Sequence, residues 1–420
     1  MRSAILFAVA AIAGAGGVCH AAANATPPST FCTAQKALVD QYVGPMVRPP
    51  SSGTAASGTP QTVGAVVVTL KLGEAPCAFA FGETAIGSGT APDEQTIFEL
   101  ASVTKTFTTS VLALRAAAGL VNVHLPVTLL LPPEYELAPR MQRVSLQQLA
   151  TFSGGFPWSD PPGFTRAWPQ YRFVQDVNTL EPVHPIPGEA DLPTVNYYSN
   201  GSIGLLGQTL MYVDSMLGVG NYPPLPTGFT RWIQDHVAGP LAMPSTRVVP
   251  PGPWATGYAI ANGHYHATLP FLWVPWGPAG ALRSNAADMR NFLRANICAH
   301  HATDPACAGL PADLLAALPP AHAPTDSVPH GTLAAPTLYT VDTETGKPSS
   351  SVQAWAWVYM PPPEPNPNNA SAIIWKDGGH PGFSTWIGFN PGKAYGIVLL
   401  YNTGGVSPKE AGLEIIRQTP

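Results

Sequence analysis

The chain carries little charge. Only 11% of its 420 residues are Asp, Glu, Lys or Arg, and its formal net charge is −5. Without a basic excess, a surface for nucleic acid is not indicated. The sequence also has no C-x-x-C pair and no H-E-x-x-H motif, and its histidine pairs, His264 with His266 and His300 with His301, are expected to be surface residues. We therefore expect no metal and no cofactor.

Long apolar runs are lacking except at the N-terminus, where one follows Arg2 and ends at Val18. Small residues up to Ala25 then supply an A-x-A-type cleavage site, so residues 1–25 are predicted to be a secretory signal peptide. The residue before Cys19 is Val rather than a small residue, which disfavours lipid attachment. We expect a soluble periplasmic protein with no stable membrane insertion after cleavage.

Cysteine is scarce, with five residues in the whole chain. Removal of the signal peptide leaves Cys32, Cys77, Cys298 and Cys307. An even number in a secreted chain suggests two disulfides. We pair Cys298 with Cys307 because they are close in sequence, which leaves Cys32 with Cys77, although four cysteines allow three pairings.

Proline (48) and glycine (40) are abundant, but 45% of the residues are hydrophobic, so stiff irregular loops on a packed core are expected. Both ends of the chain are rich in strand patterns, with helical patterns between them. This predicts an α/β (α+β) fold in which an antiparallel sheet built from both termini is flanked by helices and carries a mostly helical insert. Within a catalytic domain over 26–420, the sheet is expected at about 32–100 and 350–420 and the insert at about 101–349.

Local patterns predict the individual elements. Two segments are less regular: 156–193, rich in Pro and aromatics, either lines a cleft or caps the core, and 299–351 is expected to be an irregular excursion. Strands are predicted over 63–72, 77–82, 353–360, 372–376, 383–389 and 394–401, and helices over 32–46, 102–118, 146–152, 203–213, 229–237, 285–297 and 410–418.

Ser102 stands three residues before Lys105, where an apolar periodic run begins. On a helix, positions i and i+3 share a side, so the two side chains can touch. A desolvated lysine can take the proton of a serine hydroxyl and make the serine a nucleophile. This is the chemistry of an S-x-x-K motif. One such spacing is a weak signal by itself.

Tyr198 and Asn200 form the only Tyr-x-Asn among thirteen tyrosines, just before a predicted helix. One interpretation is an Asn that caps the helix beside a packed Tyr. The other is a phenol whose pKa is lowered by nearby ammonium groups and which shuttles protons to and from Ser102. Asn200 would then hold a substrate amide.

Lys376 leaves a predicted strand and is followed by Asp377, Gly378 and Gly379. The two glycines allow a substrate to approach the backbone closely. An ordinary hairpin end is the alternative, because Lys71 begins a similar Lys-x-Gly pattern.

The order, spacing and flanks of these three motifs resemble the β-lactamase and DD-peptidase superfamily, most nearly its class C type. The flanks include Phe98-Glu99-Leu100 before the serine, the run from Tyr198 to Gly204, and Gly382-Phe383. The resemblance extends over roughly residues 35 to 417 and implies a β-lactamase/transpeptidase-like fold.

The resemblance also implies roles for the site residues. Ser102 would be the acylated nucleophile, Lys105 would assist its deprotonation, and Tyr198 would act as base and then as acid. Lys376 would orient Tyr198 and attract an acidic group of the substrate. The backbone N–H groups of Ser102 and Gly379 would form the oxyanion hole.

One residue departs from the family pattern. The family usually has Thr or Ser between the Lys and Gly of the third motif, where this chain has Asp377. A carboxylate there repels a substrate carboxylate unless Lys376 neutralises it. Asp377, Gly378, Gly379 and Asn200 are expected to contact the substrate.

The implied function is a secreted serine hydrolase that forms an acyl-enzyme on Ser102, with β-lactam amide hydrolysis of the class C type as the first expectation. A DD-carboxypeptidase or endopeptidase acting on cell-wall peptide, or an esterase, uses the same chemistry. An inactive module that binds peptide or β-lactam belongs to a different class, and the intact set of Ser102, Lys105 and Tyr198 counts against it. The expected partners are these small-molecule or peptide substrates.

Overall fold

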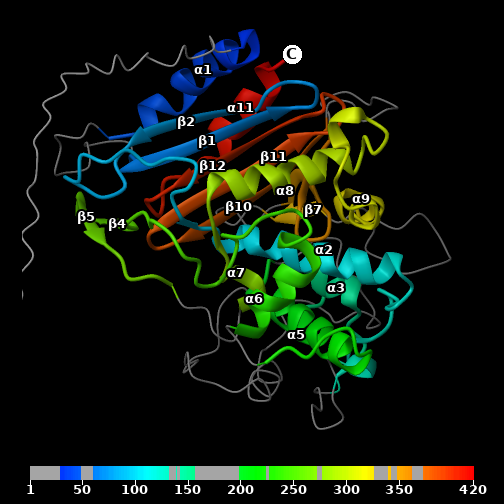
Figure 1. The fold of residues 1–420 in the computed structure, drawn as a ribbon. Coiled ribbons are helices and arrows are strands. Elements are labelled where there is room, and N and C mark those ends of the chain that lie inside the picture. The colour runs from blue at the N-terminus through cyan, green and yellow to red at the C-terminus, as the bar shows by residue number, and fades with distance from the viewer. Residues whose placement is uncertain are drawn as a thin grey trace, which may run out of the picture.

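An eight-stranded antiparallel sheet lies between layers of helices (Figure 1). The computed structural model describes residues 29–48, 60–131, 139, 142–156, 198–223, 227–271, 277–325, 339–341, 348–361 and 372–420. The strand order is β2-β1-β12-β11-β10-β9-β8-β7, so β1 and β12, from the two ends of the chain, lie side by side as the second and third strands. The predicted fold class is confirmed.

The strands of the large sheet are β1 (Gly64–Lys71), β2 (Cys77–Gly82), β7 (Tyr339–Val341), β8 (Pro348–Gln353), β9 (Val358–Met360), β10 (Ile373–His380), β11 (Phe383–Asn390) and β12 (Tyr395–Tyr401). Two small sheets pair β3 (Phe98–Glu99) with β6 (Arg283–Ser284) and β4 (Tyr258–Ala261) with β5 (His264–Ala267).

The described helices differ in length, and none of them is long and apolar enough to cross a membrane. They are α1 (Thr30–Tyr42), α2 (Thr104–Ala117), α3 (Leu146–Ala150), α5 (Asn200–Met216), α6 (Thr227–Ile233), α7 (Gly277–Gly280), α8 (Ala286–Cys298), α9 (Ala312–Ala317), α10 (Pro319–His322) and α11 (Lys409–Gln418). Shorter turns are η1 (Gly44–Met46), η2 (Ala101–Val103), η3 (Val127–Leu130), η5 (Gln234–Ala238, a π-helical turn) and η6 (Pro305–Cys307).

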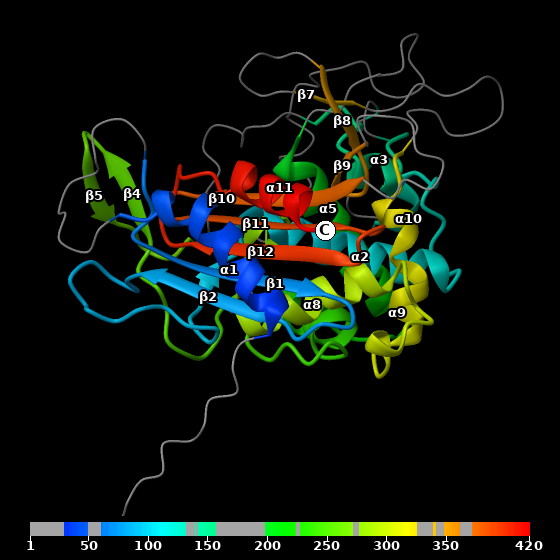
Figure 2. The same ribbon diagram turned by 90° about the horizontal axis from the view of Figure 1, so that it is seen from above.

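Strand β1 shows why the sheet is covered on both faces. Side chains alternate across a strand, so Val66 and Val68 pack into the core shared with the helical part, while Val67 packs toward α1 and α11. β1 therefore reads as a continuous apolar run, as buried strands do. Helices α1 and α11 cover one face and α8 the other, with α2 and α5 beyond it (Figures 1 and 2).

Helix α2 links this core to the site. Its apolar face includes Phe107, whose ring stacks on Phe292 of α8 with centroids 3.9 Å apart. The helix ends before Gly119, which has φ +68°. A left-handed residue of this kind terminates helices, and glycine adopts it without strain.

Some predicted segments differ from the structure. The strand predicted over 372–376 continues to His380, so Lys376 lies within β10 rather than at its end. The predicted strand over 353–360 is two strands, because the chain turns at Ala356 with φ +59°. Part of the expected excursion is regular: it holds α9 and α10, and β7 and β8 join the large sheet, so the sheet includes residues assigned to the insert. Of the segment 156–193, only Phe156, which is buried, lies within the described residues.

Both predicted disulfides are confirmed. Cys32 in α1 is bonded to Cys77 in β2, and Cys298 at the end of α8 is bonded to Cys307 in η6. The first fixes the N-terminal helix to the edge of the sheet. The second closes the turn that follows α8.

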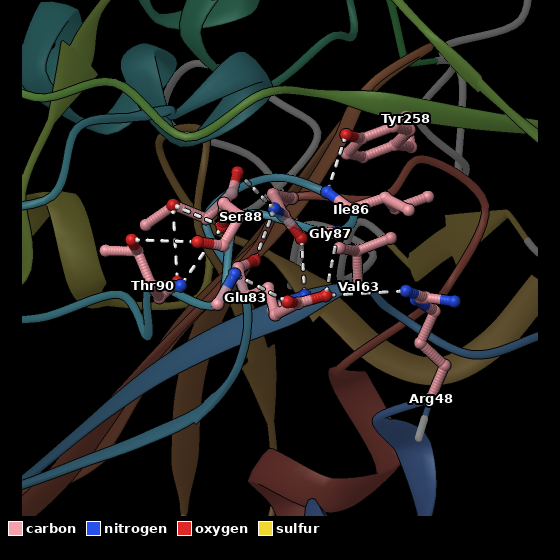
Figure 3. Close-up of polar contacts among 12 residues, drawn as sticks. Arg48, Val63, Glu83, Ile86, Gly87, Ser88, Thr90 and Tyr258 are labelled. Carbon is pink, nitrogen blue, oxygen red and sulfur yellow. Dashed lines mark hydrogen bonds and ion pairs between the residues drawn. The ribbon is translucent and has the colours of Figure 1, made fainter. Parts of the chain in front are cut away.

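The loop after β2 folds around the carboxylate of Glu83 (Figure 3). This carboxylate accepts hydrogen bonds from the backbone of Gly87 (3.2 Å) and Gly89 (2.9 Å) and pairs with Arg48 at 3.5 Å. The backbone N–H of Ile86 donates to the hydroxyl of Tyr258 in β4 at 2.9 Å. The Glu83 loop thus attaches the edge of the large sheet to the β4–β5 hairpin.

A buried histidine makes the stability of this core depend on pH. His322 is 1% exposed and contacts His300 (3.0 Å) and Asn296 Oδ1 (2.8 Å). Burial, with a smaller contribution from His300, holds the pKa of His322 well below its usual value of 6.5. As the pH falls, the unfolded chain therefore binds the proton before the folded chain does. The contribution of His322 to the free energy of unfolding is complete above about pH 6.5, the unfolded pKa, and decreases as the pH falls below it.

We expect the unfolding free energy to fall by up to about 2 kcal/mol between about pH 6.5 and about pH 5 from His322 alone. Denaturant titrations across this range should show that His322→Gln loses much of this pH dependence. His264→Gln, at an exposed position of β5, is the matched control. Equal acid sensitivity in the wild type and both variants would contradict this assignment.

Candidate active site

Ser102 lies in the turn η2, and Lys105 in the first turn of α2. Lys105 Nζ is 3.0 Å from Ser102 Oγ, as the i, i+3 spacing predicts. The preceding Ala101 is buried with φ +47°, a conformation that costs a non-glycine residue free energy. The tight connection from β3 into η2 therefore holds the serine at the start of the helix.

The surroundings of Lys105 favour the neutral amine. Its side chain is fully buried, and burial followed by the charge of Lys376 holds its pKa well below 10.5. Nζ also contacts two acceptors, Asn200 Oδ1 at 2.8 Å and Ala279 O at 2.6 Å. A neutral amine has two N–H donors for these oxygens, and its lone pair then faces the Ser102 hydroxyl. In this state Ser102 donates to Lys105, the arrangement needed for proton removal.

Tyr198 lies between the two lysines. Lys105 Nζ and Lys376 Nζ are 4.8 Å and 5.0 Å from the centroid of its ring, which also packs on Phe152 at 4.7 Å. The sequence predicted a lowered pKa, and this is wrong: burial raises the pKa of Tyr198, although Lys376 and the interaction with Ser102 oppose the shift. The phenol is therefore protonated at neutral pH.

Lys376 is buried, and its ammonium group is held by the next residue. Nζ donates to the backbone oxygen of Asp377 at 2.8 Å and to its Oδ1 at 2.7 Å. Burial lowers the pKa of Lys376, but Asp377 and Tyr198 together raise it by more. For Asp377, burial raises the pKa, but the charge and hydrogen bond of Lys376 lower it by more. The pKa of Asp377 is therefore below its usual value, and both groups are ionised.

The end of β10 lies directly beside the serine turn. A Cβ on Gly378 would be 2.3 Å from Leu100 O and 3.0 Å from Ser102 N, so only glycine fits. A Cβ on Gly379 would meet nothing within 4 Å, and this residue is exposed. β9 pairs with β10 only over Ile373–Trp375. From Lys376 onward, β9 therefore does not cover this edge of β10.

Asn200 is the first residue of α5, and its role as the helix cap is excluded. The cap is Ser199, whose hydroxyl accepts from Ser202 N at 3.2 Å. Asn200 instead directs its Oδ1 to Lys105. The structure thus brings all the predicted site residues to one place.

A buried group of three side chains near the end of β10, His380, Glu99 and Arg283, was not predicted from the sequence. His380, which follows the Lys376 motif, is 7% exposed, and its Nδ1 is 2.6 Å from Glu99 Oε2. Arg283 Nη2 donates to Glu99 Oε1 at 2.9 Å. The pKa of Glu99 is lowered because its partners outweigh its burial, whereas burial lowers that of His380. The group connects the end of β10 to the segment that precedes Ser102, a proximity that only the folded chain reveals.

The part of the chain that the structure describes contains no cluster of three or more His, Cys, Asp or Glu side chains that could hold a metal ion. His264 and His266 are exposed on β5, as expected. His300 is exposed, as expected, and contacts the buried His322. His301 is half-buried and contacts Pro391 O at 2.6 Å.

Comparison with known proteins agrees with this geometry. The family model described as Beta-lactamase matches residues 38–418. A protein named Beta-lactamase from Yersinia enterocolitica is 28% identical over 228 residues, or 53% of this chain and 52% of that protein. The match therefore covers about half the length of this curated relative.

Solved structures share the fold. A class C beta-lactamase has a TM-score of 0.70 at 18% identity, with 93% of this chain and 98% of that chain covered. The D-alanine carboxypeptidase AmpC from Burkholderia cenocepacia has a TM-score of 0.67 at 19% identity, with 92% and 99% covered. At 18% and 19% identity, these structures show that the fold is shared. The family model, which matches nearly the whole chain, shows that the chain belongs to the Beta-lactamase family.

Proposed function

We propose that the protein hydrolyses an acyl bond through an acyl-enzyme on Ser102, with the β-lactam amide as the first substrate to test. The observation that carries the proposal is the 3.0 Å contact of the Ser102 hydroxyl with Lys105, whose burial holds its pKa well below 10.5. A relative of the same family is named a beta-lactamase, and the same fold occurs in a class C beta-lactamase. This favours β-lactam hydrolysis as the activity to examine first.

In the proposed reaction, Lys105 takes the hydroxyl proton while Ser102 Oγ attacks the carbonyl carbon. The negative charge on the carbonyl oxygen is stabilised by the backbone N–H groups of Ser102 and Gly379. The leaving nitrogen or oxygen then receives a proton through Tyr198, which Lys105 reprotonates. Water attacks the ester in the second half of the cycle, releases the acid and restores Ser102.

The direct test is incubation with a chromogenic cephalosporin, followed by absorbance and intact-protein mass spectrometry. We expect an adduct of one acyl group on the wild-type protein and none on Ser102→Ala, whose turnover should fall at least about a thousandfold. Ser110→Ala, at a buried serine of the following helix α2, is the matched control. Turnover by Ser102→Ala at the wild-type rate would reject Ser102 as the nucleophile.

A second candidate uses the same steps on a different bond. A structural neighbour is named a D-alanine carboxypeptidase, so a cell-wall peptide is a reasonable substrate, and an ester is another. A long-lived adduct in the mass spectrum favours a peptidase, whereas fast release with turnover favours a lactamase.

We also propose that the protein is exported to the periplasm. The N-terminal signal pattern supports this, as do the two disulfides, since such bonds persist in oxidising compartments. Fractionation of cells that express the full chain, with N-terminal sequencing of the product, should recover a periplasmic form that lacks residues 1–25.

A further inference from the structure

Asp377 occupies the hydrogen-bonding capacity of Lys376. A lysine ammonium has three N–H donors and no acceptor. Two of them are directed to Asp377, to its backbone oxygen and its carboxylate, and the third interacts with Tyr198. An incoming carboxylate therefore has to displace an existing contact of Lys376 rather than meet a free donor.

Asp377 has an advantage over a substrate carboxylate in binding Lys376. Asp377 is the neighbour of Lys376 in the chain, so their pairing costs no loss of translational freedom, whereas a substrate has to give up its own. The Asp377 side chain is also half-exposed (51%), at the end of β10 where the glycines approach Ser102. Its charge therefore acts on a substrate as well as on Lys376.

The other charges that the structure describes around Ser102 do not compensate. Burial holds the pKa of Lys105 well below 10.5 and raises the pKa of Tyr198, which favours the uncharged form of both, and Glu99 and Arg283 form a pair at 2.9 Å. Lys376 and Asp377 form the second pair, at 2.7 Å. Lys409, whose charge also lowers the pKa of Asp377, lies 3.9 Å from Glu410. Among the described residues, these charged groups are thus paired with groups of opposite charge.

We propose that Asp377 selects acyl substrates that carry no carboxylate next to Lys376, so that uncharged esters and amides are the preferred class. This inference rests on the proposed acyl-enzyme chemistry at Ser102. It predicts that substrates with a carboxylate close to the scissile bond, including penicillins and peptides with a free C-terminus, are poorer substrates than their uncharged derivatives.

The experiment compares two acyl thioesters with the same acyl group. One has thioglycolate as its leaving group, and the other has the methyl ester of thioglycolate, so the pair differs mainly in one carboxylate. Thiol release is measured with a colorimetric reagent and corrected for the spontaneous rate. For the wild-type protein, we expect kcat/KM to be about tenfold higher for the uncharged thioester, the size of effect expected from a partly screened charge pair.

The same two substrates are then given to Asp377→Asn, which keeps the side-chain size and removes the charge. We expect the preference for the uncharged thioester to fall by about tenfold or to reverse. Asp40→Asn is the matched control because Asp40 also pairs with a nearby lysine (Lys36, 2.5 Å) and is 46% exposed, but lies on α1 across the sheet. It makes the same change in net charge and should leave the preference unchanged.

The outcomes separate the two proposals. A wild-type preference for the anionic thioester overturns the role of Asp377 without any variant, even if Asp377→Asn fails to fold. An equal change in kcat/KM for both substrates in Asp377→Asn also overturns it. Turnover that persists in Ser102→Ala, or no turnover of either thioester by the wild type, rejects the acyl-enzyme proposal and the inference that rests on it.

Discussion

Lys105→Met is expected to slow acylation of Ser102 by about a thousandfold, within the range for loss of a general base. Methionine has nearly the length of lysine and suits a fully buried position, but it has no basic lone pair. Ser102 would lose the group 3.0 Å away that accepts its proton. The rate is measured as adduct formation in single-turnover mass spectrometry, which separates acylation from product release.

Lys36→Met, at an exposed lysine of α1, serves as the control for the substitution itself. Circular dichroism and a melting curve show whether each variant is folded. Acylation of folded Lys105→Met at the wild-type rate would exclude Lys105 as the base and leave Tyr198 as the candidate. The raised pKa of Tyr198 argues against that outcome, because a protonated phenol cannot accept a proton at neutral pH.

Asp214→Asn is expected to lower the free energy of unfolding by about 3–5 kcal/mol, the cost of removing one partner of a buried ion pair. Asp214 of α5 is fully buried and accepts from Arg115 Nε (2.5 Å), Arg115 Nη2 (2.9 Å) and Trp232 Nε1 (2.7 Å). It therefore connects α5 to α2 and α6. The asparagine would leave the buried guanidinium of Arg115 without its countercharge.

The measurement is denaturant unfolding at constant pH and salt. Asp235→Asn provides the comparison, because Asp235 pairs with Arg231 at 3.6 Å on the surface of the same part of the protein, where such pairs contribute about 0–1 kcal/mol. A loss in Asp214→Asn no larger than that in Asp235→Asn would show that the buried pair contributes little.

Most regular elements could be predicted because their signals are local. The apolar spacing in α8 and the Gly after α2 mark helices without reference to the rest of the chain. The break between β8 and β9 could not be found in this way. Ala356 takes a left-handed conformation in which its N–H donates to Ala150 O of α3 at 2.8 Å, so a distant helix contributes to the turn.

In the active site, too, some features could be predicted from local sequence and others depend on the folded chain. The order of the three motifs indicates which side chains meet, but their protonation depends on burial, which the motifs do not contain. The pKa of Tyr198 is an example, since the packing of Phe152 and its other neighbours raises it. His380 is another example, because its contact with Glu99 joins residues 281 positions apart in the chain.

The pairing of β1 with β12 has a consequence for how the protein folds. Val68 lies opposite Val398, so this strand pair joins segments from the two ends of the chain. Contacts between residues so distant in sequence close large loops, and they slow folding. During synthesis, almost the whole polypeptide has to emerge before β12, the second pairing partner of β1, exists. The apolar residues of β1 stay exposed over that interval, when binding by a chaperone would protect them from aggregation.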